Sequence, residues 1–467
     1  MKNTLKKLLA LTLSLLMLAS LLTGCVSSFA NSTSAEKKEE TPKQPEEPSG
    51  QKETKEEPKP AETEQKQEPA QTAPGATELD VWYAVSGTSG ETFVKQSEAF
   101  AAEKGVTLNL SYSGGSADTA TKVSAALLTN TQPDVALMYA GPLYTGGRDD
   151  YTIGTLMDGE GFDKADIFEG MLDYCTYMDG GICAVPYGIS TQVLYYNKDI
   201  LAAAGVDMTK PPKTWSEFYD VCLQVLEKGN LKGNKEFTAF DTTDEAWLFK
   251  SMLMQNGCPI VESKDGTITP IFNDEAAKAV ADYWYSLVTS GIMAPGEHNN
   301  AENKFLAGNL AFVAASSNRI SRWNGTTDFA LGAIEMPYFV NPSLALGGNV
   351  LVILTSDPAK VQLAWEYICS LTDVKNNTEF ALATGYLPIH KSALEQDTVK
   401  QAIEQNEMYT VAFNQLSYTW AYTHFEQMGN MDVLLNTMLN KLEKGRGTAE
   451  DLLNKAVSDL ADEIAQG

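Results

Sequence analysis

The chain has 467 residues, 21% of them charged, and a formal net charge of −26. A surface this acidic argues against binding to nucleic acid and against direct adsorption to anionic lipid. The length leaves room for two domains with apolar cores, and the six cysteines are too scattered to indicate a disulfide framework.

The first residues have the pattern of a bacterial export signal. Three lysines precede a continuous apolar run over residues 8–22, which is too short and wrongly flanked for a stable membrane span. Small residues then lead to Cys25, as in a bacterial lipobox. We predict a signal peptide over 1–24 and lipidation of Cys25, which would anchor the protein to the extracytoplasmic face of the membrane. A plain transmembrane anchor and an ordinary signal peptide with a chance cysteine are the alternatives.

The next segment, 25–76, is made of Lys, Glu, Pro, Gln, Ser and Thr, with almost nothing apolar after Phe29. Such a segment cannot bury enough surface to offset the entropy that ordering costs. It predicts a disordered tether that separates the globular part from the membrane and contributes no binding or catalytic residues.

From residue 77 onward, predicted strands alternate with predicted helices. The strands are 78–85, 106–112 and 133–140, and the helices between them are 91–104 and 118–130, with a Ser/Gly loop before the first helix. This alternation indicates a mostly parallel sheet covered on both faces, whose ligands sit beyond the carboxyl ends of the strands. Those ends lie at 82–87, 112–118 and 139–142, so Trp82, Ser86 and Asp118 become candidate ligand contacts. A core aromatic residue and a loop serine are the alternatives for Trp82 and Ser86.

The stretch 183–218 organises the middle of the chain. It predicts a short strand ending at Pro186, a polar crossing over 187–192, a second strand over 193–196 and a brief helix stopped by Gly205. Thr214 and Glu217 follow two prolines with the spacing of a capping box.

The remaining pattern continues with helices and a return of the chain. We predict helices over 246–257 and 273–291, a strand and loop within 305–320, return segments 331–339 and 346–354, a helix opening at Asp357 and Pro358, and two C-terminal helices split at 445–447.

The order of Pro186, Tyr196-Asn197-Lys198-Asp199, Gly205 and the Pro212–Phe218 run resembles the extracellular solute-binding proteins (family 1) of carbohydrate-type ABC importers, and in particular their sn-glycerol-3-phosphate-binding branch. The segment 383–390, ATGYLPIH, matches the same family. The resemblance implies an α/β, two-lobed periplasmic-binding-protein-like (type II) fold with a hinge and a ligand cleft between the lobes. Lobe 1 would contain 77–188 and about 346–390, and lobe 2 about 189–345 and 391–467.

The resemblance also implies ligand contacts. Residues at family contact positions are Ser190, Thr191, Trp247, Ser316, Ser317, Gly348 and Tyr386. Asp118 aligns with a family Tyr-Glu pair, but Ala117 replaces the tyrosine. Gly348 would let backbone amides approach a ligand. Helix packing is the alternative for Trp247, and a structural turn is the alternative for Ser190 and Thr191.

The chain departs from the glycerol-3-phosphate branch at one position. The family segment R-G-x-R-x-G-N corresponds to residues 424–430 here, and Gln427 stands where an arginine would grip phosphate. An amide cannot replace the bidentate bonds of a guanidinium. We therefore predict a neutral, hydroxyl-rich ligand. Glycerol-3-phosphate or a glycerophosphodiester is the alternative ligand, with Arg319 or Arg322 supplying the positive charge.

Enzyme motifs are absent from the sequence: it has three histidines and no HExxH, zinc-spaced Cys pair, GxSxG elbow or phosphate-binding loop. We predict a monomeric receptor, without cofactor or metal, that delivers a carbohydrate or polyol to an ABC permease. A surface glycoside hydrolase or a carbohydrate-binding adhesin is the alternative. Cys175 and Cys183 flank a predicted turn, so a bridge between them and two free thiols both stay open.

Overall fold

The computed structural model describes most of the chain after residue 74. The described residues are 75–140, 152–159, 161–177, 180–231, 233–264, 266–296, 298–421, 425 and 427–466. The predicted signal peptide, Cys25 and nearly all of the predicted tether lie outside these residues.

The first sheet has the strand order β2-β1-β3-β12-β4. Its strands are β1 (Glu78–Tyr83), β2 (Thr107–Tyr112), β3 (Val135–Tyr139), β4 (Val185–Ser190) and β12 (Gly347–Ile353). β1 is parallel to β2 and β3, whereas β12 is antiparallel to β3 and β4. Alternate residues of β3 enter different cores, with Leu137 in one and Met138 in the other. The sheet is therefore buried on both faces, as the apolar runs predict.

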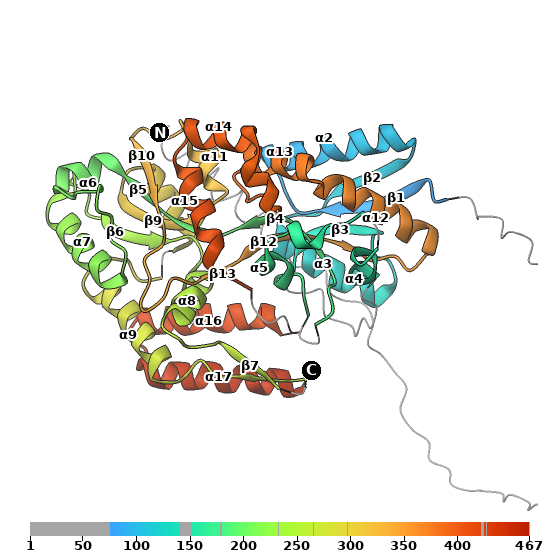
Figure 1. The fold of residues 1–467 in the computed structure, drawn as a ribbon. Coiled ribbons are helices and arrows are strands. Elements are labelled where there is room, and N and C mark those ends of the chain that lie inside the picture. The colour runs from blue at the N-terminus through green and yellow to red at the C-terminus, as the bar shows by residue number, and fades with distance from the viewer. Residues whose placement is uncertain are drawn as a thin grey trace, which may run out of the picture. The chain divides into compact units, whose positions relative to one another are not determined.

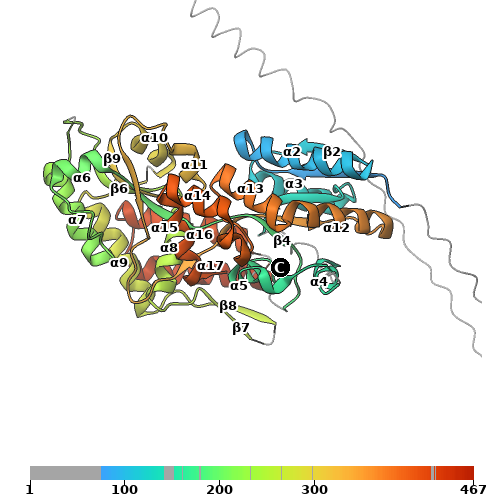
Figure 2. The ribbon, with the colours of Figure 1, turned by 45° about the horizontal axis from the view of Figure 1, so that its top comes forward.

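Helices cover both faces of this sheet. They are α2 (Gly87–Lys104), α3 (Ser116–Thr129), α4 (Thr152–Met157), α5 (Glu169–Asp173), α12 (Pro358–Thr372) and α13 (Val374–Thr384). Phe93 of α2, Leu363 of α12 and Phe380 of α13 share a core with Leu137. Val123 of α3 and the α5 residue Met171 join Met138 on the other face. Figures 1 and 2 show α2, α12 and α13 side by side.

The second sheet has the strand order β10-β5-β9-β6. Its strands are β5 (Gln192–Asn197), β6 (Thr238–Thr242), β9 (Leu310–Ser316) and β10 (Leu331–Ile334). β5 is antiparallel to β9 and β10, and β6 is parallel to β9. One face, with Leu194 and Phe240, faces a core of its own, whereas Val193 and Val313 enter the core that also holds Met138 of the first sheet. The two sheets thus share one apolar core at their junction.

Most helices around the second sheet come from the middle and the end of the chain. They are α6 (Lys198–Ala204), α7 (Trp215–Lys228), α8 (Glu245–Gln255), α9 (Glu275–Thr289), α10 (Ala301–Leu306), α11 (Arg319–Trp323), α16 (Met428–Glu443) and α17 (Ala449–Gln466). α16 and α17 pack against each other and against α9, as Figure 1 shows. The C-terminal helices are therefore part of the body around the second sheet.

Shorter elements complete the described chain. They are β7 (Val261–Lys264), β8 (Thr267–Pro270), β11 (Leu344–Ala345), β13 (Thr419–Trp420), α14 (Asp397–Gln405), α15 (Met408–Asn414), and the 3-10 helices η2 (Lys164–Asp166), η3 (His298–Asn300), η4 (Lys391–Glu395) and η5 (Gln415–Tyr418). β7 and β8 form a hairpin, and β11 pairs with β13.

The predicted polar crossing over 187–192 is wrong in extent. β4 runs to Ser190 and β5 begins at Gln192, so Thr191 alone separates a strand of one sheet from a strand of the other. Tyr187 and Ile189 are fully buried between helices, and this burial keeps the segment extended. A second crossing lies beside the first, since Gly347 of β12 pairs with Ser190. Leu346 alone separates β12 from β11, which pairs with β13 and packs in the core around Leu194 and Phe240.

Two segments predicted as loops are helical. α2 begins at Gly87, directly after its N-cap Ser86, where we expected a Ser/Gly loop. α11 occupies 319–323, where we expected a loop after β9. Small polar residues favour loops in isolation, but both helix starts lie at the junction of the sheets and are fixed by packing, for example of the buried Ile320.

The local signals of helix ends are confirmed. The Thr214 hydroxyl accepts a bond from the Glu217 backbone N–H, and the Glu217 carboxylate accepts one from the Thr214 N–H. Asp357 caps α12, and Gly205 ends α6 with a φ of +72°. Each of these signals works within four residues, so long-range packing does not override it.

Cys175 and Cys183 are not bridged by a disulfide in the structure. The backbone N–H of Cys183 donates to the carbonyl of Cys175, and Thr176 pairs with Ile182. Burial raises the pKa of the Cys175 thiol well above its usual value, which disfavours the reactive thiolate.

Candidate functional site

Two adjoining cavities lie where the two sheets meet. The larger, about 660 Å³, is lined by Ala84, Val85, Ser86, Gly87, Thr88, Ser89, Ser116, Asn318, Arg319, Ser321, Arg322, Ala383, Thr384 and Tyr386. The smaller, about 300 Å³, is lined by Ser116, Ala117, Tyr139, Ser190, Asp244, Trp247, Lys250, Leu346, Gly347, Gly348, Asn349, Tyr386 and Asp432. Because they share Ser116 and Tyr386, we treat them as two parts of one cleft.

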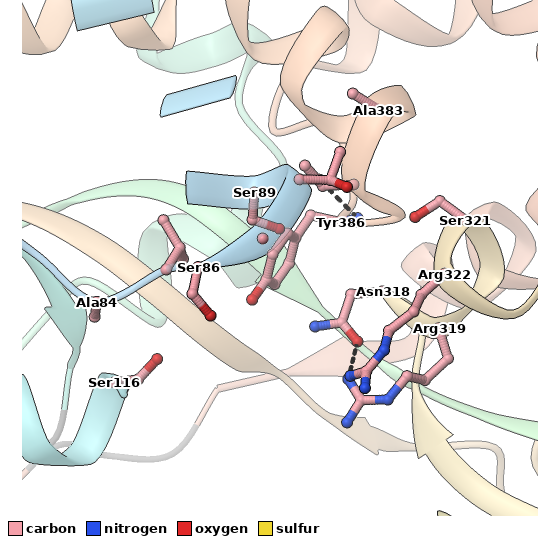
Figure 3. Close-up of a pocket in the computed structure, with 14 residues that line it drawn as sticks. Ala84, Ser86, Ser89, Ser116, Asn318, Arg319, Ser321, Arg322, Ala383 and Tyr386 are labelled. Atoms are coloured by element: carbon pink, nitrogen blue, oxygen red, sulfur yellow. Dashed lines mark hydrogen bonds between the residues drawn. The ribbon is translucent and has the colours of Figure 1, made fainter. Parts of the chain in front are cut away.

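Five of the residues predicted as ligand contacts line this cleft. Ser86 borders the larger cavity, Ser190, Trp247 and Gly348 border the smaller, and Tyr386 borders both. Figure 3 shows Ser86, Ser116 and Tyr386 on one side of the larger cavity, with Arg319 and Arg322 across from them. The cleft therefore lies beyond the carboxyl ends of strands in the first sheet, where the alternation of strands and helices predicts a ligand.

The other predicted contacts line neither cavity. Trp82, Asp118, Thr191, Ser316, Ser317 and Gln427 are the residues concerned. Asp118 accepts a bond from the Gly115 N–H and so caps α3, and Thr191 accepts one from the buried Gln415 amide. Trp82 packs against the core that the sheets share, and Gln427 precedes α16 half-buried. Their role in binding stays a prediction.

Gly348 is required by the backbone for a reason that differs from the predicted one. Its φ is +120°, and a Cβ there would lie 2.1 Å from the carbonyl oxygen of Gly188 on β4. The close neighbour is the adjacent strand, so strand pairing at the crossing excludes any side chain whether or not a ligand is present.

Several cleft residues were missed by the sequence reasoning. Asp244 lies two residues beyond the end of β6, so its place at a strand end could have indicated it, whereas Lys250 and Asp432 lie within helices and carry no local signal. Tyr139 and Ser116 fall within the strand ends noted above but were not singled out. Asp432 lies on α16, five residues beyond Gln427, so the same C-terminal segment does reach the cleft.

The smaller cavity contains a charged cluster. Lys250 is 2% exposed and its Nζ lies 2.5 Å from Asp432 Oδ1. Asp244 caps α8 by accepting a 2.9 Å bond from the Trp247 N–H, and it is an exposed residue that lines the cavity. Protein atoms around it desolvate the carboxyl and, with the negative charge of Asp432, raise the pKa of Asp244 to about 6.

The larger cavity has a positive wall. Arg319 donates from Nε and Nη2 to Glu302 Oε2 at 3.1 and 3.0 Å, and Arg322 Nη2 lies 3.1 Å from Glu302 Oε1. One carboxylate thus faces two guanidinium groups, which leaves one positive charge in excess. Arg319 also donates to the side chain of Asn318, as the dashed line in Figure 3 marks.

The aromatic walls of the cleft are held in place. Trp247 Nε1 donates to the Ala345 carbonyl at 2.8 Å, and its ring lies so close to Gly347 that a Cβ there would be 3.0 Å away. The ring of Tyr386 stacks on Phe380 with centroids 5.7 Å apart and an interplanar angle of 13°. Fixed aromatic faces beside carboxylates and hydroxyls suit a polar ligand with apolar C–H faces.

This architecture defines the class of the protein. Two α/β lobes, connected by single-residue crossings and enclosing a polar, aromatic-lined cleft, form a two-lobed type II periplasmic-binding-protein-like fold. The chain matches the family described as bacterial extracellular solute-binding protein over residues 95–406. The chain therefore belongs to that family, and the predicted family and fold class are confirmed.

Two sequence relatives share one name. The sn-glycerol-3-phosphate-binding periplasmic protein UgpB of Pectobacterium atrosepticum is 27% identical over 301 residues, which are 61% of this chain and 66% of that protein. The protein of the same name from Salmonella typhimurium is 25% identical over 317 residues, 64% of this chain and 71% of the relative. The chain thus spans about two thirds of the length of the relatives it matches.

Similar solved structures support the fold. UgpB from Mycobacterium tuberculosis in complex with glycerophosphocholine superposes with a TM-score of 0.71 at 22% identity, covering 84% of this chain and 99% of the other. The cyclic alpha-maltosyl-1,6-maltose binding protein from Arthrobacter globiformis gives a TM-score of 0.70 at 20% identity, covering 84% and 100%.

Two properties of the described residues concern membranes and metal ions. No helix there is long and apolar enough to cross a membrane. The same part of the chain contains no group of three or more His, Cys, Asp and Glu side chains placed to hold a metal ion.

Proposed function

We propose that this protein is a lipid-anchored, monomeric receptor that captures a small carbohydrate or polyol between its lobes and delivers it to an ABC permease. The observation that carries the proposal is the cleft at the junction of the sheets, with Trp247 and Tyr386 beside Ser190, Asp244 and Asn349. Ligand that touches both lobes stabilises a closed state by its differential affinity for that state.

We propose the lobe boundaries as 77–188 with about 346–390, and about 189–345 with 391–467. The strand membership of the two sheets supports this division, because β12 returns to the first sheet and α16 and α17 pack around the second. The crossings at Thr191 and Leu346 would serve as the hinge.

The smaller cavity favours a ligand without phosphate. Gln427 brings no positive charge where the family arginine would stand, and Glu302 already pairs with both Arg319 and Arg322, which leaves one positive charge in excess at the larger cavity only. A phosphate would compete with that carboxylate and also meet the negative end of the cleft at Asp244 and Asp432. A carbohydrate instead places C–H faces on the aromatic rings and hydroxyls on the polar groups.

Calorimetry on the full chain tests this ligand class. The panel contains neutral mono- and oligosaccharides, polyols, glycerol-3-phosphate and glycerophosphodiesters, and we expect binding by sugars or polyols. Tight binding of a phosphate compound alone, lost in Arg319→Ala, would show that the alternative ligand class is right. Lys455→Ala is the matched control, because Lys455 lines neither cavity and forms an exposed ion pair with Asp459.

We infer further that the chain does not hydrolyse its ligand. Asp244 and Asp432 share the smaller cavity, as paired carboxylates do in glycosidases, but the ammonium of Lys250 holds Asp432. A carboxylate neutralised in this way is a poor nucleophile and a poor base. Incubation of a bound oligosaccharide with the protein should therefore yield no new reducing ends, and their appearance would favour the hydrolase.

A further inference from the structure

The smaller cavity has an excess of negative charge. Its charged lining residues are two carboxylates and one ammonium, and the ammonium of Lys250 is bound to Asp432. No ion pair among the described residues includes Asp244, an exposed residue that lines the cavity. When the lobes close on a ligand, that carboxylate loses water and needs a positive partner.

A second, independent feature points to a hydrogen-bond donor on the ligand. Asn349 lies in β12, is 1% exposed and lines the same cavity. Its amide group interacts with the Tyr386 hydroxyl, but its Oδ1 has no hydrogen-bond partner among the described residues. A buried acceptor without a donor costs free energy, so a ligand N–H or O–H at this position would relieve it.

The aromatic lining fits the same chemistry. Tyr139, Trp247 and Tyr386 border the cavity, and the rings of Trp247 and Tyr386 are fixed by the contacts described above. Aromatic faces attract cations through their ring electrons, and they also pack on the C–H face of a sugar ring. A neutral hydroxyl would satisfy Asn349 but would bring no positive charge to Asp244, which only the shared ammonium of Lys250 now attracts.

We propose that the smaller cavity is the subsite for a protonated primary amino group, so that the ligand is an amino-bearing carbohydrate. Its ammonium would lie between Asp244 and Asn349, and the rest of the ligand would extend past Tyr386 toward the larger cavity. This inference rests on the proposed function, because it names the kind of carbohydrate that the receptor takes.

Calorimetry on the full chain at pH 7.5 compares three sugars of one skeleton: glucosamine, N-acetylglucosamine and glucose, together with the corresponding β-1,4-linked disaccharides. We expect the free amine to bind at least about tenfold more tightly than both neutral forms. N-acetylation keeps an N–H but removes the charge, so it separates hydrogen bonding from charge compensation.

Asp244→Asn should reduce the advantage of the amine over glucose to within about twofold, since asparagine keeps an acceptor that caps α8. Asp244→Ser, which also caps, replaces it if the asparagine variant is unfolded by circular dichroism. Glu245→Gln is the matched control. It removes a carboxylate one residue away that does not line the cavity, and the amine should keep its advantage.

The outcomes separate this inference from the proposed function. Equal affinity for amine and neutral sugars, or an amine advantage that survives Asp244→Asn, would overturn the inference and leave the receptor function standing. Binding by phosphate compounds alone, or by no carbohydrate or polyol at all, would overturn both.

Discussion

The backbone conformation at position 348 permits only glycine, and the effect of a substitution on stability can be measured. Gly348→Ala places a Cβ on the Gly188 carbonyl at a φ of +120°, so we expect a loss of roughly 2–4 kcal/mol in the free energy of unfolding, measured by urea denaturation. Gly429→Ala is the control, because a Cβ there meets no atom within 4 Å and the residue lies in α16. It should stabilise by about 0.4–1 kcal/mol. A Gly348→Ala protein as stable as wild type would contradict the strand geometry.

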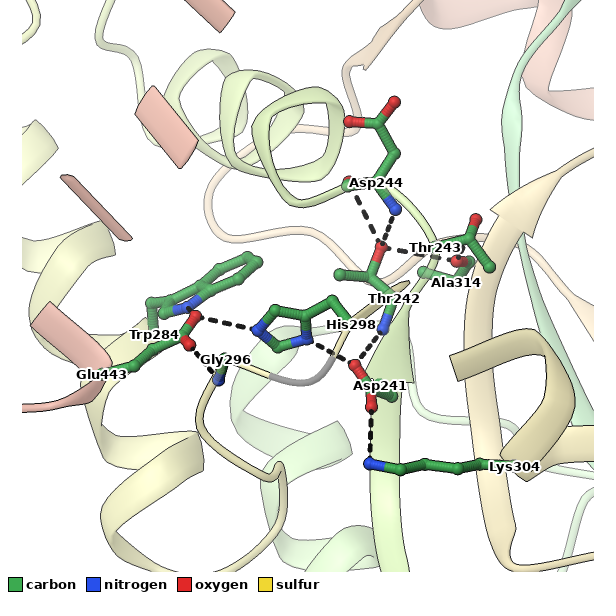
Figure 4. A network of polar contacts seen from close by, with 10 residues as sticks. All are labelled: Asp241, Thr242, Thr243, Asp244, Trp284, Gly296, His298, Lys304, Ala314 and Glu443. Carbon is green, nitrogen blue, oxygen red and sulfur yellow. Dashed lines mark hydrogen bonds and ion pairs between the residues drawn. The ribbon is translucent and has the colours of Figure 1, made fainter. Parts of the chain in front are cut away.

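His298 is the centre of a buried ionic network, shown in Figure 4. Its Nδ1 lies 2.6 Å from Asp241 Oδ1 and its Nε2 lies 3.0 Å from Glu443 Oε1. Burial alone would lower the pKa of His298, but these two hydrogen bonds outweigh it and raise the pKa to about 10. Trp284 and the Gly296 N–H also donate to Glu443, so the network connects α16 to β6 and α9.

His298→Gln should cost about 3–5 kcal/mol of unfolding free energy near pH 6, because Glu443 loses its buried cation and Asp241 keeps only Lys304, whose Nζ lies 3.8 Å from Asp241 Oδ2. In the wild type the folded pKa of about 10 lies above the unfolded value of 6.5. The stabilisation is therefore complete below pH 6.5 and is lost as the pH rises toward 10. Urea denaturation from pH 6 to 9.5 should show the difference between wild type and variant shrinking, and a constant difference would contradict a charged His298. Lys455→Ala, which breaks an exposed pair with Asp459, should cost under about 0.5 kcal/mol.

At the scale of elements, the sequence predicts what is decided locally. The Thr214 and Glu217 box and the stop at Gly205 depend on neighbours within four residues, and they are found as expected. The extent of β4 and β5 depends on burial of Tyr187 and Ile189 by helices from distant parts of the chain, so a six-residue polar crossing was predicted where Thr191 alone separates the strands.

The candidate site also contains residues that the local sequence predicts and residues that only packing brings to the cleft. Ser86 lies just beyond the end of β1, where alternation of strands and helices already places ligands. Lys250 and Asp432 come from α8 and α16, 182 positions apart, and meet only because these helices pack together. No pattern within either helix distinguishes a cleft residue from a solvated one.

The first turn of α8 positions an aromatic face in the cleft, and this leads to a binding prediction. Trp247→Ala should weaken ligand binding by roughly 1–3 kcal/mol, since it removes the fixed ring while Asp244 still caps the helix. Calorimetry with the tightest ligand of the panel measures it. Trp365→Ala is the control, because that ring packs on Phe162 away from both cavities and should leave affinity unchanged. Normal affinity with a lowered melting temperature would assign Trp247 to packing alone.

At the scale of the whole molecule, the two lobes are coupled more closely than two separate domains would be. One core contains Met138 and Val350 from the first sheet together with Val193 and Val313 from the second. The buried Thr191 joins β4 of the first sheet to β5 of the second, and the buried Leu346 joins β12 to β11, which packs in the core of the second lobe. Closure of the cleft would therefore bend a packed junction at two neighbouring single residues, as in hinge motions that a few residues absorb.

The last prediction concerns attachment of this two-lobed body to the membrane. We expect Cys25→Ser to release the protein into the soluble fraction, because a diacylglyceryl group supplies two buried chains where one is only marginally anchoring. Ligand affinity should not change, since residues 25–76 have the composition of a tether without fixed contacts to the cleft. Cell fractionation followed by immunoblotting measures the release, and calorimetry on the released protein measures the affinity. Cys369→Ser is the matched control, because Cys369 is a free thiol within α12 and its loss should leave the protein with the membrane. A Cys25→Ser protein that stays wholly in the membrane fraction would reject lipidation and favour a transmembrane anchor through residues 8–22.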